Sequence, residues 1–178
     1  MNSSLEKFIM ATEGPKALAT FFLFINLLMY AILVVVAGWA LNYGIDETPQ
    51  SVSELSLPAR LFPVYYPIGN LATGFVVMFS LIAGLVGVAA SLTGLQNVVQ
   101  GSTSGLLSAA ASSVMAWGLT LLAMGLACKE ISIGWRTAGL RALETLTIMA
   151  SGTQLLCTGA IHAALPSTIS QPLFTGRA

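Results

Sequence analysis

Six polar side chains recur at helical spacing inside one apolar stretch of the chain, residues 141–165. They are Glu144, Thr147, Ser151, Gln154, Thr158 and His162. Steps of three and four residues place all six on one face of a single helix. The stretch is long enough to cross a bilayer, for which about 20 residues suffice. A polar face at that depth must meet other helices or water, because lipid cannot satisfy its hydrogen bonds.

This polar face has two interpretations. It could join helices by hydrogen bonds, a common role of hydroxyl and amide side chains in membranes. It could instead line a permeation path or a ligand site, since ionisable side chains within a membrane are often functional. Glu144 and His162 would then lie at opposite ends, roughly 27 Å apart along the axis, with Gln154 between them. Histidine is the side chain most able to change charge near neutral pH.

The composition identifies an integral membrane protein. Of the 178 residues, 56% are hydrophobic and 8% are charged, whereas soluble domains carry about 25% charged residues. Seven basic residues balance seven acidic ones, so no net field indicates nucleic acid as a partner. Membrane lipids are the expected surroundings.

The apolar stretches predict an all-α membrane protein with a bundle of four transmembrane helices. The expected spans are 17–41, 68–93, 104–127 and 141–165 within a membrane domain 17–165, preceded by a polar segment 1–16 and followed by a polar tail 166–178. The first span is too long for a signal peptide and is expected to remain. Residues 42–67 contain four prolines, which predicts an extended, turn-rich loop.

Small residues form seams on the second and third spans. The positions that we assign to helix packing are Gly84, Gly87, Ser91, Ser108 and Ser112. Small side chains allow close helix approach in membranes, so the second and third spans are predicted to pack together through Gly84 and Gly87. A glycine-rich seam could alternatively mark a hinge or a pore.

Charged residues gather between the third and fourth spans. Lys129, Glu130, Arg136 and Arg141 lie there, close to Glu144. They form either a neutralised interfacial cluster or a mouth that attracts anions. In the first span, Asn26 is expected to donate an interhelical hydrogen bond, with ligand contact as the alternative. If a substrate path exists, its predicted binding residues are Asn26, Arg141, Glu144, Gln154 and His162.

The remaining candidates for chemistry favour a protein that is not an enzyme. Cys128 and Cys157 are expected to be free thiols at different depths, because a disulfide needs Cα atoms within about 7 Å. One histidine and two scattered cysteines do not match a metal site. No nucleophile is paired with a base, so no catalytic residue and no cofactor are predicted. The long acidic loop is easily exported, which favours cytoplasmic termini, although the basic third loop favours the reverse.

Several stretches resemble the plant AWPM-like family of small, four-span membrane polypeptides induced by abscisic acid and dehydration. The resemblance covers roughly residues 26–162 and is carried by the stretches NLLMY, GWALN, GNLATGFVVMFSLIAGLVG and AWGLTLLAMGLACKEI, the last leading into GWR and LRALE. It implies a multi-pass plasma-membrane protein of plant stress and dormancy responses. Abscisic acid uptake has been attributed to the family, and this substrate is implied by the resemblance alone.

Two functions therefore remain open. The first is transport of a small amphipathic carboxylate, with abscisic acid as the implied example, along the polar face of residues 141–165. The second is a structural role, in which the protein forms a homo-oligomer through its small-residue seams and stabilises or organises the membrane during dehydration. No inverted repeat is evident, and one four-span bundle is small for alternating access. An oligomeric pore is therefore easier to envisage than a monomeric one.

Overall fold

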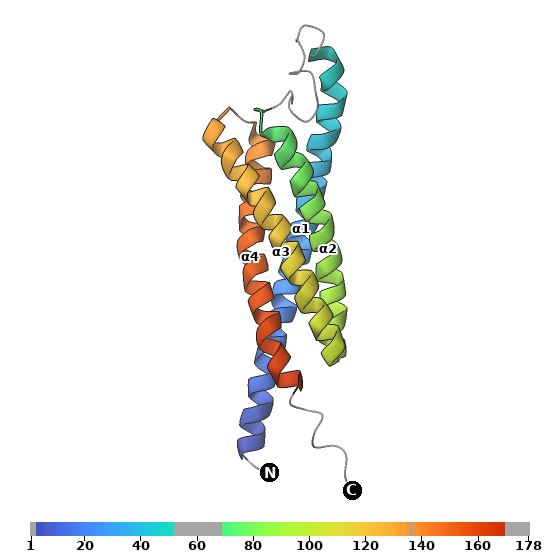
Figure 1. Cartoon of the computed structure of the whole chain (residues 1–178), viewed down its shortest axis with the longest axis vertical. Coiled ribbons are helices and arrows are strands. Elements are labelled where there is room, and N and C mark those ends of the chain that lie inside the picture. Colours follow the sequence, from blue (N-terminus) through green and yellow to red (C-terminus); the bar gives the residue numbers. More distant parts are fainter. Residues whose placement is uncertain (1–2, 52–68, 136, 170–178) are drawn as a thin grey trace.

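The computed structural model describes residues 3–51, 69–135 and 137–169, and these form four long helices (Figure 1). The helices are α1 (Ser3–Ser51), α2 (Thr73–Gln100), α3 (Thr103–Ile133) and α4 (Ala138–Ile169). Each contains a segment that is long and apolar enough to cross a membrane. The predicted fold class, an all-α membrane protein with four transmembrane helices, is confirmed.

The four helices form an antiparallel bundle in which consecutive helices are neighbours. α1 packs against α2 and α4, and α3 packs against the same two helices from the opposite corner. Figure 1 shows that α1 begins and α4 ends at one end of the bundle, where α2 also turns into α3. We call this the terminal end. The other end, where α2 and α4 begin and α3 finishes, is the loop end.

Asn70 ties the start of α2 to the finish of α3 at the loop end. Its Oδ1 accepts a hydrogen bond from the backbone N–H of Ala72 (3.0 Å), which satisfies a free donor at the start of α2. Its Nδ2 donates to the carbonyl oxygens of Glu130 (3.1 Å) and Gly134 (2.8 Å) at the finish of α3, where the Glu130 carbonyl also accepts the N–H of Gly134 (3.2 Å). α2 therefore begins at Thr73 and not at residue 68, because residues 69–72 form this connection.

Turns close the hairpins on both sides of α3. Gly101, between α2 and α3, has φ 66°, and Gly134 at the finish of α3 has φ 79°; a residue without a side chain adopts both readily. Ser102 caps α3 by accepting the N–H of Gly105 at 3.2 Å. Trp135 follows with φ 52°, and its indole is exposed at the loop end, where aromatic side chains favour the membrane interface.

α1 differs most from the predicted boundaries. It begins inside the segment 1–16 and continues through residues 42–51, for which an extended loop was predicted. A hydrogen bond from Asn42 Nδ2 to Asp46 Oδ2 (3.0 Å) links successive turns in this part, since residues four apart meet on a helix. The remainder of the predicted loop, 52–67, and the tail 170–178 lie outside the described residues.

The glycines of α2 face α1, so the prediction that they join α2 to α3 is wrong. A Cβ atom at Gly84 would lie 2.8 Å from Val34 Cγ2, and one at Gly87 would overlap the ring of Tyr30. Helical spacing identifies the face but not the neighbour, and here larger α1 side chains occupy the space. Ser91 is buried, whereas Ser108 is exposed.

Two apolar clusters fill the bundle. The loop-end cluster contains Tyr30, Leu33, Ala37, Ala40, Val76, Val77, Ala127, Leu140, Leu143 and Ala150. The terminal-end cluster contains Ala19, Leu23, Val98, Leu106, Ala109, Ala110, Cys157, Ile161 and Ala164. Cys157 is thus buried in the terminal-end cluster while Cys128 is exposed, and both thiols are free, as predicted.

Candidate functional site

Buried polar side chains from all four helices form a series along the bundle, which we call the polar core. From the loop end to the terminal end it comprises Thr73, Glu130, Glu144, Ser80, Thr147, Ser151, Tyr30, Thr120, Asn26, Gln154, Ser113 and Thr158, each less than one-tenth exposed. Five of the six polar positions of α4 belong to it. The polar face of α4 therefore points into the bundle, where other helices supply partners.

Two buried carboxylates mark the loop end of the polar core. Glu130 of α3 is fully buried and accepts a hydrogen bond from the Thr73 hydroxyl at 2.5 Å. Glu144 of α4 is 2% exposed. Lys129 and Arg141 are exposed at the same end of the bundle. The surface of this end therefore carries basic groups, together with the exposed carboxylate of Asp46 on α1, and two acidic groups lie inside it.

The next contacts join α4 to α2 and α3. Ser80 and Thr147 hydroxyls lie 3.2 Å apart. Thr147 donates to its own helix at the Leu143 carbonyl (2.8 Å), so Ser80 is the donor between the two hydroxyls. Ser151 lies against Met124 of α3, with 3.0 Å between Oγ and Sδ.

Tyr30 crosses the middle of the bundle. Its hydroxyl lies 2.8 Å from Thr120 Oγ1. Thr120 donates to the Ala116 carbonyl at 2.7 Å, so Tyr30 donates to Thr120. This hydrogen bond connects α1 to α3, the two helices at opposite corners, and the Tyr30 ring occupies the space above Gly87 of α2.

Asn26 and Gln154 meet one turn further toward the terminal end. Asn26 Nδ2 donates to Gln154 Oε1 at 2.9 Å, as the expected role of Asn26 required. Gln154 Nε2 donates to the Ser113 carbonyl (3.1 Å), and the Ser113 hydroxyl donates to Thr158 Oγ1 (3.1 Å). Asn26 Oδ1 has no hydrogen-bond partner among the described residues. An acceptor remains available in the middle of the membrane.

The structure brings only part of the predicted binding set together. Asn26 and Gln154 touch, and Glu144 lies in the same polar core toward the loop end. His162 does not join them: its side chain is exposed, and its Nδ1 lies 2.8 Å from the Thr158 carbonyl of its own helix. The expectation that His162 faces the interior is therefore wrong. At the terminal end that face of α4 reaches the edge of the bundle, where Ile161 supplies the core contact instead.

Sequence reasoning missed several members of the polar core. Tyr30 shares a helix face with Asn26, and Ser113 and Thr120 are seven residues apart on α3. Residues seven apart lie two helical turns apart on the same face, and this spacing could have identified Ser113 and Thr120 as a second polar face. Glu130 was grouped with the surface charges, although it is fully buried.

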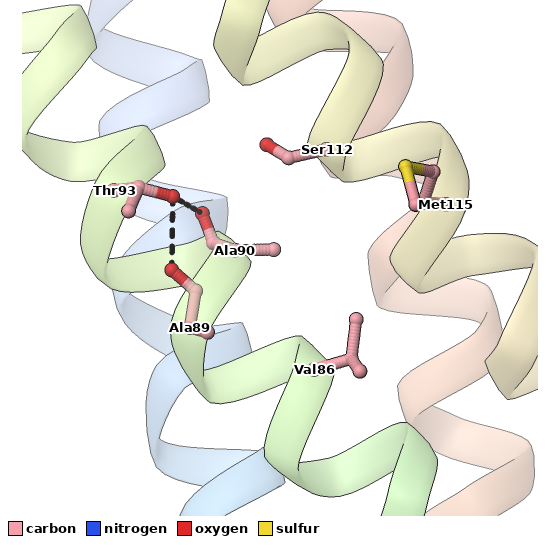
Figure 2. A pocket seen from close by; sticks show the side chains of 6 residues that line it. All are labelled: Val86, Ala89, Ala90, Thr93, Ser112 and Met115. Carbon is pink, nitrogen blue, oxygen red and sulfur yellow. Dashed lines mark hydrogen bonds between the residues drawn. The ribbon is translucent and has the colours of Figure 1, made fainter.

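A groove between α2 and α3 is separate from the polar core. It has a volume of about 190 Å³ and is lined by Val86, Ala89, Ala90, Thr93, Ser112 and Met115. Figure 2 shows the Thr93 hydroxyl directed to the carbonyl oxygens of Ala89 and Ala90, at 2.9 and 3.2 Å. Ser112 likewise donates to Ala109. Since both hydroxyls are bonded within their own helices, the groove is apolar in character.

The fold and the polar core together define a small multi-pass α-helical membrane protein with a hydrogen-bonded polar interior. The chain belongs to the AWPM-19-like family, whose model matches residues 24–164. It is 39% identical over 157 residues to the membrane protein PM19L of Oryza sativa subsp. japonica, a match that covers 88% of this chain and 83% of that protein. No solved structure matches the chain. The resemblance read from the sequence is confirmed.

Proposed function

We propose that the protein is a plasma-membrane facilitator for a small amphipathic carboxylic acid, with abscisic acid as the substrate. The supporting observation is the polar core, which runs through the bundle from Glu144 near the loop end to Thr158 near the terminal end. Hydroxyl and amide groups at successive levels can exchange their mutual hydrogen bonds for bonds to a passing solute. A largely apolar site with a few polar groups suits a ligand of this kind.

The charges favour passage of the protonated acid. Within the described residues, the buried charged side chains are Glu130 and Glu144, both acidic. An anion would lose its hydration in the membrane, which is costly, and these two side chains supply no positive charge to replace it. The exposed Lys129 and Arg141 can concentrate the anion at the loop end. The acid would then enter the polar core after gaining a proton.

The identity of the acid is taken from the family resemblance. The resemblance connects such proteins with abscisic acid, dehydration and dormancy, and with the plasma membrane. The role requires no cofactor and no catalytic residue. It uses hydrogen-bonding side chains that the structure places inside the bundle.

Uptake of labelled abscisic acid into liposomes that contain the full chain tests the proposal. We expect the wild-type protein to accelerate uptake over protein-free liposomes, and Gln154→Leu to reduce it several-fold because the amide bonds to Asn26 and Ser113 disappear. Gln96→Leu is the matched control, since Gln96 is exposed on α2. Wild-type liposomes that take up the acid no faster than empty ones would overturn the transport function.

A second candidate function is structural, and it rests on a different observation. Gly118 and Gly125 of α3, and Gly152 and Gly159 of α4, are exposed, and a Cβ atom at any of them would meet nothing within 4 Å. Each pair is seven residues apart and thus shares a helix face. Such faces allow close approach of another helix in a membrane. The protein would then form homo-oligomers that organise the membrane during dehydration.

The mass of the protein in lipid nanodiscs tests this second candidate. The structural role predicts a defined oligomer for the wild type and its dissociation in a Gly118→Leu, Gly125→Leu double variant. A wild-type protein that remains monomeric at high protein-to-lipid ratio would exclude assembly through these faces.

A further inference from the structure

The side chain of Tyr30 crosses the bundle at the central level of the polar core. Tyr30 is fully buried and reaches from α1 to Thr120 on the opposite helix α3. Its ring lies over Gly87 of α2, so closely that a Cβ atom there would overlap it. Tyr30 therefore contacts α2 and α3 from α1 and occupies the middle of the bundle.

Members of the polar core lie on both sides of Tyr30. Toward the loop end lie the hydroxyls of Ser80 and Thr147 and the carboxyl group of Glu144. Toward the terminal end the series continues from the Asn26–Gln154 contact to Thr158. The aromatic ring of Tyr30 thus interrupts a series of polar groups. A bulky side chain between two polar segments can block the passage of water between them.

We propose that Tyr30 and Thr120 form a gate across the polar core, closed in this structure by their hydrogen bond. The gate rests on the proposed transport function, for which it supplies the regulated step. Breaking the bond frees the Tyr30 ring to rotate, which connects the loop-end segment to the Asn26–Gln154 level. The glycine at position 87 leaves room for the ring in the closed state.

Cys157 provides a reporter for this gate that does not depend on any substrate. It is fully buried and lies three residues after Gln154 on α4, on the terminal side of Tyr30. A charged, water-soluble thiol reagent reaches it only if water does. The full chain with Cys128→Ser is placed in lipid nanodiscs, because Cys128 is exposed and would react. The rate of Cys157 modification is then measured.

Tyr30→Phe and Thr120→Val remove the hydrogen bond and keep the shape of each side chain. We expect each to raise the modification rate on the order of fivefold, the change in an equilibrium that one net hydrogen bond produces. The modification rate of the double variant should be close to that of either single variant, because both substitutions remove the same hydrogen bond. Tyr43→Phe is the matched control, since Tyr43 is exposed on the loop-end part of α1. The modification rate of this variant should equal that of the wild type.

Three results would overturn the gate. The first is an equal rate of Cys157 modification in the wild type, Tyr30→Phe and Thr120→Val. The second is an equal rise of that rate in the Tyr43→Phe control. The third is an equal rise in the modification rate of a second reporter, Ala109→Cys, placed in a chain without the other cysteines. Ala109 is buried in the same terminal-end cluster but on α3, so an equal increase there would mean that the whole bundle loosens.

The same variants separate the gate from the transport proposal. Faster uptake of abscisic acid in Tyr30→Phe, together with faster Cys157 modification, supports both. If the wild type transports the acid and the reporter does not respond, transport stands and the gate is wrong. If the wild type does not transport the acid but the reporter responds, water access is gated and the substrate assignment is wrong.

Discussion

Asn26 of α1 and Gln154 of α4, separated by 128 residues in the chain, share a hydrogen bond of 2.9 Å in the buried middle of the bundle. Neither side chain is satisfied by its own helix. Each depends on the other helix for a partner, so this contact orients α1 against α4. It also marks the level that a solute moving along the polar core would have to pass.

Removing this contact should destabilise the bundle in a measurable and non-additive way. We expect Asn26→Leu to lower the free energy of unfolding by about 1–3 kcal/mol, because the Gln154 carbonyl loses its donor. The double variant with Gln154→Leu should reveal a coupling of about 0.6–1.7 kcal/mol, the range of interhelical hydrogen bonds in membranes. Reversible unfolding in mixed micelles measures both. Strictly additive effects would contradict a direct energetic contact.

Alanine substitutions of two glycines should have opposite effects on stability. Gly87→Ala should destabilise the protein by about 1–3 kcal/mol, because its Cβ atom overlaps the Tyr30 ring and forces α1 away from α2. Gly118→Ala has open space and should stabilise α3 by up to about 1 kcal/mol through its better helix propensity. Thermal unfolding in matched detergent measures both. A stabilising Gly87→Ala would show that α1 and α2 are not in close contact there.

Asn70→Ala should loosen the loop end without affecting the terminal end. The variant loses bonds to Glu130 and Gly134 and the cap on Ala72. A lost helix cap alone costs about 1 kcal/mol. Faster hydrogen exchange is expected at the start of α2 and the finish of α3, with no change near Gly101. An equal change in the exchange rate along the whole of both helices would show that Asn70 has no local role.

His162→Ala should leave the rate of abscisic acid uptake unchanged, in contrast to Gln154→Leu. The His162 side chain is exposed, and its Nδ1 lies 2.8 Å from the Thr158 carbonyl of its own helix. Uptake is measured in parallel liposome preparations at pH 5 and pH 7. A lower rate or an altered pH dependence in His162→Ala would place the imidazole on the transport path after all.

The sequence alone determined the class of protein and the polar face of α4. Apolar stretches of membrane length predict helices because a lipid environment requires every backbone group to bond within its own segment. Helical periodicity placed Glu144, Gln154 and Thr158 on one face, and lipid around the bundle required that face to turn inward. Local chemistry and the solvent fix these features, so they need no knowledge of neighbouring helices.

Only the tertiary structure decided which helix each face meets. The glycine seam of α2 could serve any neighbour, and α1 occupies it because Tyr30 and Val34 fill the space that Gly84 and Gly87 leave. Likewise, the pairing of Tyr30 with Thr120 depends on two opposite helices lying within reach of one side chain. His162 lies outside because the bundle no longer covers that face of α4 at the terminal end. Periodicity reports a direction around one helix axis, whereas contacts depend on the positions of several axes at once.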